Sequence, residues 1–209
     1  MLTCCYAHID RQWSEQELAE KLLLLPQNMR AEASKKRVWT DKQLYIAGKL
    51  LLAKLLQQFD IHFSLGDVKY SSYHRPYFDH GIDFNIAHSG NFAICCGTAT
   101  GKVGVDIEQI KPTDLSEYTD YFTYAEREVI RSYPDIMRGF YDFWTRKEAL
   151  LKAVGTGFNI PFSSVDVTGD VVEYANMTYH IQKLNIDTGY PCHIATTSPS
   201  SVILLAVNL

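Results

Sequence analysis

The chain has 209 residues, of which 46% are apolar and 12% aromatic, and this is enough to fill a large hydrophobic core. Such a composition excludes an intrinsically disordered chain. The formal net charge of -4, with a charged fraction of 21%, excludes a generally basic surface for nucleic acid. Any anion site must therefore be built from a local group of cations.

Five cysteines occupy two adjacent pairs and one single position, namely Cys4, Cys5, Cys95, Cys96 and Cys192. Their spacing contains no C-x-x-C and no cysteine and histidine pattern typical of zinc sites. We therefore expect buried thiols in a reducing compartment. The N-terminus lacks a basic region followed by an apolar run, and no apolar run is long enough to span a bilayer. We expect a cytoplasmic protein without a membrane partner.

The first predicted elements are an edge strand over residues 2–9 and a helix. Ser14 and Glu17 have the spacing of a capping box, which predicts that the helix starts there and ends near Pro26. Four positive charges then follow at Arg30, Lys35, Lys36 and Arg37. A charge run of this kind is typical of a solvated helix face. Residues 44–59 carry apolar side chains at helical core spacing and predict a long, largely buried helix.

A strand over residues 61–70 and a loop rich in aromatic side chains are predicted next. Residues 83–97 predict a strand, a tight turn and a second strand. His88 lies where the first of these strands enters the turn. A lone histidine is often structural, but this corner can also bind an anion through its imidazole and backbone N–H groups.

Acidic and apolar residues alternate around Asp106 and Glu108, which predicts a strand with both carboxylates on one face. Glu148 and Lys152 are four residues apart in a helix predicted from about 138 to 154, so they share a face. Three converging carboxylates suit a hard cation such as Mg²⁺, and Lys152 suits the phosphate groups that such a cation holds. Taken in isolation, each pair is better explained by a structural role: Asp106 and Glu108 as a solvated strand face, and Glu148 and Lys152 as a helix ion pair.

The remaining pattern gives an α+β fold. A helix is predicted to begin within residues 122–128, and short strands are predicted at 164–168, 171–175, 178–184, 190–197 and 201–207. The sequence around Trp39 resembles that around Trp144, and a strand, a turn and a strand follow each. We therefore expect two related lobes in a pseudo-twofold, pseudodimeric arrangement, residues 1–102 and 103–209, with a ligand site at their interface.

The two copies of this repeat differ at the candidate site residues. Glu148 aligns with Gln43, Lys152 with Ala47, and His88 with Thr196. The site would therefore be asymmetric, with each lobe contributing different groups.

Motifs in four segments, 84–90, 104–108, 122–126 and 143–155, together resemble the 4′-phosphopantetheinyl transferases of the surfactin-synthetase-activating type. The resemblance implies a two-lobed pseudodimeric fold that binds coenzyme A and Mg²⁺ at the lobe interface. It also implies transfer of the 4′-phosphopantetheine arm to a serine of an apo acyl- or peptidyl-carrier protein, with release of adenosine 3′,5′-bisphosphate.

The resemblance also assigns roles by position. It implies metal ligands at Asp106, Glu108 and Glu148, a pyrophosphate contact at Lys152, and coenzyme A contacts at His88 and Arg75. The basic run of Arg30, Lys35, Lys36 and Arg37 falls where the family places phosphate-binding cations. Ala87 and His74 depart from the serine and glycine of the family pattern, and the first change removes a hydroxyl that we expect at the phosphate site.

A carrier serine needs a base, and we predict Glu148 for this role, with Glu126 as the alternative. We expect residues 111–131 to contact the carrier protein. Because the partner lobe is already in the chain, we expect a monomer. Two other classes fit the same residues: a Mg²⁺-dependent pyrophosphate hydrolase that uses water, and a binding module without catalysis.

Overall fold

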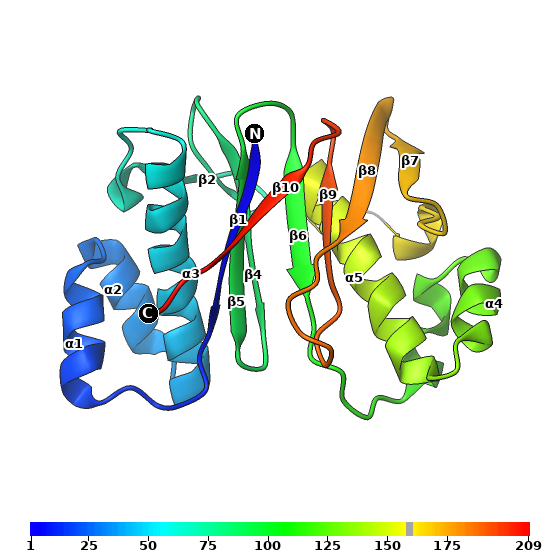
Figure 1. The fold of residues 1–209 in the computed structure, drawn as a ribbon, viewed down its shortest axis with the longest axis horizontal. Helices are drawn as coiled ribbons and strands as arrows, with labels where there is room; N and C mark the ends of the chain where they lie inside the picture. Colours follow the sequence, from blue (N-terminus) through cyan, green and yellow to red (C-terminus); the bar gives the residue numbers. More distant parts are fainter. Residues whose placement is uncertain (158–160) are drawn as a thin grey trace.

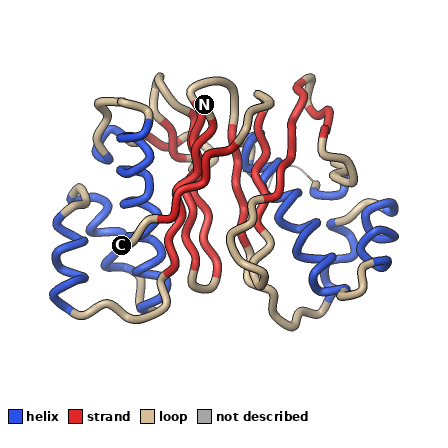
Figure 2. The backbone as a smooth tube through the Cα atoms, in the orientation of Figure 1, coloured by secondary structure: helices blue, strands red, loops and turns tan. Residues whose placement is uncertain are grey.

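Two four-stranded sheets lie next to each other at the centre of the molecule, and helices cover the outer face of each (Figure 1). The structure is a computed structural model and describes residues 1–157 and 161–209. Figure 2 shows the strands gathered between the two groups of helices. The α+β class expected from the sequence is confirmed.

The first sheet has the strand order β10-β1-β5-β4 and the second has the order β6-β9-β8-β7. The first consists of β1 (Leu2–His8), β4 (Asp83–Ser89), β5 (Phe92–Thr98) and β10 (Val202–Ala206). The second consists of β6 (Val103–Ile107), β7 (Val171–Tyr174), β8 (Met177–Lys183) and β9 (Cys192–Thr196). A small pair is formed by β2 (Lys69–Tyr70) and β3 (Pro76–Tyr77). β10 runs parallel to β1, and the other neighbouring strands are antiparallel.

The described helices are α1 (Glu15–Leu23), α2 (Gln27–Lys35), α3 (Trp39–Gln58), α4 (Tyr124–Ser132) and α5 (Ile136–Val154). Shorter 3-10 turns are η1 (Leu65–Asp67), η2 (Leu115–Tyr121) and η4 (Phe162–Ser164). The capping box at Ser14 is present, as predicted. No helix among the described residues combines the length and the apolarity that crossing a membrane requires.

Hydrophobic cores lie on both faces of each sheet. α3 packs its apolar side chains on the outer face of the first sheet, and α5 does the same on the second. A third core lies between the sheets, where Ile94 of β5 meets Val105 of β6. β6 approaches α5 closely because Gly104 has no side chain, and a Cβ there would collide with the backbone of Ala149. This close approach places the acidic strand against the helix that carries Glu148.

Several predicted strands are absent. Residues 61–70 contain the turn η1, which Ser64 and Asp67 cap reciprocally, instead of a continuous strand. Residues 164–168 lie in and after η4. β1 is not an edge strand, since β10 pairs with its outer side. The first error arises because a side-chain cap stabilises a turn that apolar spacing does not indicate. After η4, which has no side-chain cap, the carboxylate of Asp166 accepts the N–H of Thr168 and forms a local turn.

Two cysteine pairs face each other across β1 and β5. Cys4 pairs in register with Cys96, and the two form a disulfide. Cys5 pairs in register with Cys95 on the opposite face, and both remain free, buried thiols. The prediction of thiols throughout is therefore wrong for Cys4 and Cys96. Adjacent cysteines on two antiparallel strands in register necessarily give one facing pair on each side of the sheet.

The repeat within the chain appears in the strand orders. β1-β5-β4 with α3 corresponds to β6-β9-β8 with α5. In this correspondence His88 of β4 has its equivalent on β8, so its sequence alignment with Thr196 of β9 is wrong. β9 and β10 do not pair with each other, because β10 joins the first sheet although it lies in the range predicted for the second lobe. The pseudo-twofold axis itself stays a prediction.

His193 of β9 gives a stability prediction. It is 2% exposed, and its Nδ1 lies 2.8 Å from Oγ1 of Thr145. Burial, followed by the charges of Arg146, Lys183 and Arg138, lowers the pKa of His193 from 6.5 to about 3. Between these values the unfolded chain binds a proton that the folded chain does not. Acidification should therefore destabilise the fold by up to about 1.4 kcal/mol per pH unit.

The variant His193→Gln has no imidazole to protonate, so its free energy of unfolding should fall less steeply as the pH is lowered. Urea unfolding of both proteins between about pH 7 and pH 4 measures the difference in slope. Identical slopes would show that His193 is protonated as readily in the folded chain as in the unfolded one.

Candidate active site

An acidic residue from β6 and an acid and a lysine from α5 converge at the lobe interface. Lys152 Nζ donates a hydrogen bond to Asp106 Oδ1 at 2.5 Å. Asp106 is 4% exposed, and its Oδ2 is buried without a hydrogen-bond partner. Glu148, one turn before Lys152, is half-buried on the same helix face. The site therefore contains an acceptor atom that no group in the described part of the chain satisfies.

The acids of this site repel one another in a poorly hydrated environment. Burial, reinforced by the charges of Glu148 and Glu108 and opposed by Lys152, raises the pKa of Asp106 to about 7. Burial and Glu108 likewise raise the pKa of Glu148, again opposed by Lys152. Burial opposes the charged form of Lys152, but Asp106 and Glu148 outweigh it and raise its pKa. An additional cation would relieve this repulsion.

Glu108 is held by a residue of the other lobe. Ser89 Oγ donates to Glu108 Oε2 at 2.6 Å and accepts the backbone N–H of Gln109 at 3.1 Å. Ser89 ends β4, next to His88. The strand–turn–strand predicted at residues 83–97 thus brings the histidine corner and the acidic strand together.

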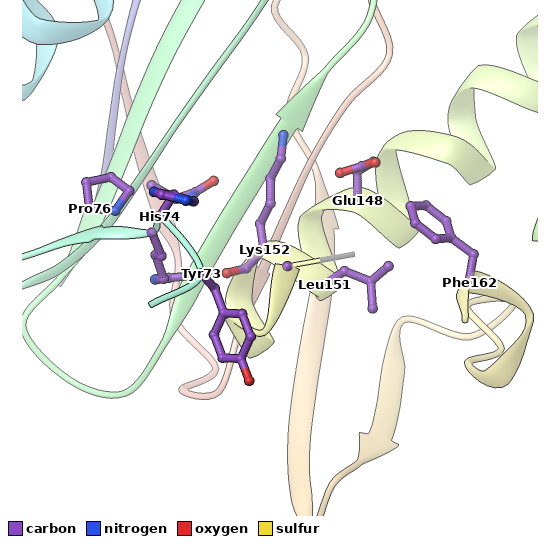
Figure 3. A pocket seen from close by; sticks show the side chains of 11 residues that line it. Tyr73, His74, Pro76, Glu148, Leu151, Lys152 and Phe162 are labelled. Carbon is purple, nitrogen blue, oxygen red and sulfur yellow. Dashed lines mark hydrogen bonds between the residues drawn. The ribbon is translucent and has the colours of Figure 1, made fainter. Parts of the chain in front are cut away.

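A mainly apolar cavity of about 220 Å³ opens beside Glu148 and Lys152. Figure 3 shows both side chains on the cavity side of α5, with the loop bearing Tyr73 and Pro76 opposite. Phe162 lies at its other end. The cavity therefore offers an apolar space bordered by Glu148 and Lys152.

A second cavity, of about 590 Å³, lies on the N-terminal lobe between α3 and β4. His88 lines this cavity. Desolvation by neighbouring atoms, followed by the charges of Lys152 and Lys36, lowers the pKa of His88. Lys49 also lines it, is 9% exposed, and has its ammonium 5.1 Å from the ring centre of Tyr45. Burial lowers the pKa of Lys49. The positive potential here suits an anionic ligand.

Sequence reasoning missed Lys49, because it treated the helix over residues 44–59 as apolar core. The available signal was a single lysine at a core-facing position of an otherwise apolar helix. A buried ammonium without a carboxylate partner is costly, so such a residue often serves a ligand.

The four cations of the basic run have different surroundings. All are exposed. Lys35 pairs with Glu32 at 2.5 Å on the surface of α2. Lys36 lies over the ring of Tyr45 and close enough to affect the pKa of His88. Lys36 thus lies beside Tyr45, which lines the second cavity, while Arg30 and Arg37 are exposed on the surface.

Arg75 contacts β4, β6 and α5. Its Nη2 donates to Asp83 Oδ2 at 2.7 Å and to the carbonyl oxygen of Val103 at 2.9 Å, and its Nη1 donates to the carbonyl oxygen of Lys152. Its side chain is 13% exposed and packs over Gly155, which ends α5 in the left-handed conformation. In this arrangement Arg75 connects β4 and β6 to the C-terminal end of α5.

Glu126 is fully buried, and both of its carboxylate oxygens contact other groups of the protein. Its Oε2 lies 2.9 Å from Lys147 Nζ, and its Oε1 accepts the N–H of Val167 at 2.8 Å. Lys147 also donates to the carbonyl oxygens of Phe162 and Val165. In the structure the oxygens of Glu126 hold the loop after α5, and its alternative assignment as the base stays a prediction.

The described residues contain no preformed group of three histidine, cysteine, aspartate or glutamate side chains around a common metal position. The donor chemistry nevertheless fits a hard cation. Asp106 Oδ2 lacks a partner, and Glu108 and Glu148 both raise the pKa of Asp106 by their charge. Carboxylate oxygens are the ligands that Mg²⁺ prefers.

Comparisons with known proteins point to one family. The model of the 4′-phosphopantetheinyl transferase superfamily matches residues 102–195. The 4′-phosphopantetheinyl transferase HetI of Nostoc sp. is 32% identical over 154 residues, which cover 68% of this chain and 65% of that protein. The transferase gsp of Aneurinibacillus migulanus is 32% identical over 129 residues, covering 59% of this chain and 53% of that protein. The transferase Sfp of Bacillus subtilis is 24% identical over 212 residues, covering 92% and 91%.

The chain thus spans less than two thirds of the length of the first two relatives and nearly all of the third. Asp106, Glu108, Glu148 and Lys152 all fall inside the region that the family model matches.

Proposed function

The chain belongs to the 4′-phosphopantetheinyl transferase superfamily, and on this basis we propose that it transfers the 4′-phosphopantetheine arm of coenzyme A to a serine of an apo acyl- or peptidyl-carrier protein. The observation that carries the proposal is the convergence of Asp106, Glu148 and Lys152 at the lobe interface, beside an apolar cavity. We further propose a monomer with two lobes, residues 1–102 and 103–209, in which β10 completes the sheet of the first.

Coenzyme A carries a pyrophosphate and a 3′-phosphate, which an acidic protein must bind with local cations. The proposed pyrophosphate contact is Lys152, at the edge of the first cavity. The proposed site for the nucleotide phosphate is the second cavity, where Lys49 and the nearby Lys36 supply positive charge and His88 supplies an imidazole N–H. Arg75 is directed to protein groups, so its proposed effect on coenzyme A acts through the position of Lys152.

The proposed Mg²⁺ ligands are Asp106, Glu108 and Glu148. When bound, Mg²⁺ would neutralise phosphate charge and make the phosphorus more electrophilic. Support comes from the unpartnered Oδ2 of Asp106 and from the repulsion among the three acids. The same cation would allow Asp106 to stay ionised in its buried position.

The proposed base is Glu148. Its raised pKa makes it a better proton acceptor than an ordinary glutamate, and it lies on the cavity side of α5. It takes the hydroxyl proton of the carrier serine as the serine oxygen bonds to the phosphorus of the pantetheine phosphate. The bond from that phosphorus to the bridging oxygen breaks, and adenosine 3′,5′-bisphosphate leaves. Lys152 donates a hydrogen bond to the departing oxygen and stabilises its charge.

The variant Lys152→Ala should lower kcat by about 100-fold, which corresponds to ~3 kcal/mol of transition-state stabilisation. Its binding of coenzyme A should change less, because the negative charge on the leaving oxygen is greatest in the transition state. Steady-state kinetics and calorimetric titration with coenzyme A separate the two effects. Lys54→Ala, on the exposed side of α3, is the control. Weaker binding at unchanged kcat would limit Lys152 to anchoring.

The proposed activity is tested by incubating the protein with coenzyme A, Mg²⁺ and apo carrier proteins and measuring intact masses. The expected result is a mass gain of one phosphopantetheine group on the carrier and equimolar adenosine 3′,5′-bisphosphate. Release of the bisphosphate without a carrier protein would instead identify a pyrophosphate hydrolase. A panel of fatty-acid, polyketide and peptide carriers identifies the pathway.

The proposed carrier surface is the segment 111–131. Within it Tyr121 is 40% exposed, and Tyr124 and Val129 of α4 are 71% and 38% exposed. Exposed aromatic side chains with nearby cations such as Arg131 suit the acidic helices of carrier proteins. Charge reversal at Arg131 should raise the KM for the carrier and leave the affinity for coenzyme A unchanged.

A further inference from the structure

β6 forms one edge of its sheet, and its backbone N–H groups point alternately to the two sides. On the side of β9, the N–H groups of Glu108 and Ile110 donate to the carbonyl oxygens of Pro191 and Gly189, in the loop before β9, at 3.0 and 2.9 Å. On the other side, where no strand of its own sheet is present, the partners are side chains of β4. Three bonds of this kind occur: Val103 N–H to Asp83 Oδ2 at 2.8 Å, Val105 N–H to Asn85 Oδ1 at 3.1 Å, and Gln109 N–H to Ser89 Oγ at 3.1 Å.

The three hydrogen bonds share the same register between β4 and β6. In each, the two residues are 20 positions apart in the chain. Alternate side chains of β4 therefore satisfy alternate N–H groups of β6, which joins the edges of the two sheets. The same spacing places Ala87 opposite the N–H of Ile107, and an alanine methyl offers no acceptor. Both residues are buried, 5% and 0% exposed.

This register also corrects an expectation about Ala87. Side chains alternate along a strand, so Ala87 points to the core between the sheets, away from His88. A serine there would place its hydroxyl on the N–H of Ile107 and not in the phosphate site.

We propose that Asn85 is a positioning residue for the reaction, and that it acts by fixing the strand that carries Asp106. This inference rests on the proposed function. Asn85 is 7% exposed, and the N–H that it binds belongs to the residue directly before Asp106. Ser89 performs the same task at the other end, where it binds the N–H of Gln109 and the carboxylate of Glu108. The row of side chains thereby fixes the two acids relative to His88.

The row can be tested without any ligand by amide hydrogen exchange, followed by NMR of the ¹⁵N-labelled chain. Asn85→Leu removes the acceptor, and Asn85→Asp keeps an oxygen at that place. In Asn85→Leu the amide of Val105 should exchange at least about tenfold faster, and Asn85→Asp should restore slow exchange. Ala87→Ser should slow exchange at Ile107 by a similar factor. Unchanged exchange at both amides would show that the row does not exist.

The positioning role is tested by kinetics on the same variants. Asn85→Leu should lower kcat about tenfold and raise the Mg²⁺ concentration for half-maximal rate, while the KM for coenzyme A stays within about twofold. Asn85→Asp should recover most of the rate. Faster exchange at Val105 with unchanged kcat and Mg²⁺ dependence would refute positioning. If the wild-type chain modifies no carrier protein, the proposed function fails, and the exchange results still decide whether the row exists.

Discussion

Asp106→Asn should reduce carrier modification by at least about 100-fold, equivalent to ~3 kcal/mol, and leave the protein folded. The carboxylate is replaced by a neutral group of nearly the same shape, so the proposed cation loses a ligand while packing is kept. Stability should be equal or higher, because burial and two neighbouring acids disfavour the charge at this position. Transfer assays and thermal unfolding of the same preparation measure both effects.

The matched control is Asp170→Asn, at a carboxylate that is 79% exposed and distant from the acidic cluster. It should retain full activity. Near-normal transfer by Asp106→Asn would remove Asp106 from the proposed metal ligands. A variant that fails to fold would contradict the expectation that the buried charge is unfavourable.

Lys147→Met should lower the free energy of unfolding by about 3–5 kcal/mol. The substitution leaves the carboxylate of Glu126 charged and fully buried, and it removes the hydrogen bonds to the carbonyl oxygens of Phe162 and Val165. Urea unfolding followed by circular dichroism measures the change, with Lys54→Met on the exposed side of α3 as control.

The double variant Glu126→Gln with Lys147→Met should recover a large part of this loss. Glutamine keeps the oxygen that accepts the N–H of Val167 and carries no charge that needs a partner. A single variant that loses less than about 1 kcal/mol would show that water reaches Glu126 when Lys147 is removed.

Local signals in the sequence were sufficient for the helices and for the acidic strand. α5 could be predicted because apolar spacing continues from Phe140 to Val154 and a glycine follows. In the structure this glycine, Gly155, ends the helix with a φ of 82°. The β4–β5 hairpin could be predicted from alternation around a turn at Gly90. The acids and Lys152 could be placed together because a strand face and a helix face each present them in one direction.

The remaining features depend on contacts between distant segments. Nothing near Val202 indicates that β10 leaves its own hairpin and pairs with β1. Arg75 has the sequence pattern of a ligand-binding loop residue. Its contact with the carbonyl oxygen of Lys152 joins segments that are 77 residues apart, so the local sequence does not indicate it. The proposed role of Asn85 depends on β6 being the edge strand of its sheet, so that its N–H groups need side-chain acceptors. No local sequence pattern predicts this.

The position of β10 has a consequence for how the chain folds during synthesis. The sheet that begins with residue 2 is completed by residues 202–206, which the ribosome makes after every other strand of that sheet. Until then β1 exposes an unpaired edge, and exposed edges promote association with other chains. An expression fragment that ends after residue 102 would keep this open edge permanently. We therefore expect the first lobe to aggregate when produced alone, and to become soluble when a peptide spanning residues 202–206 is supplied.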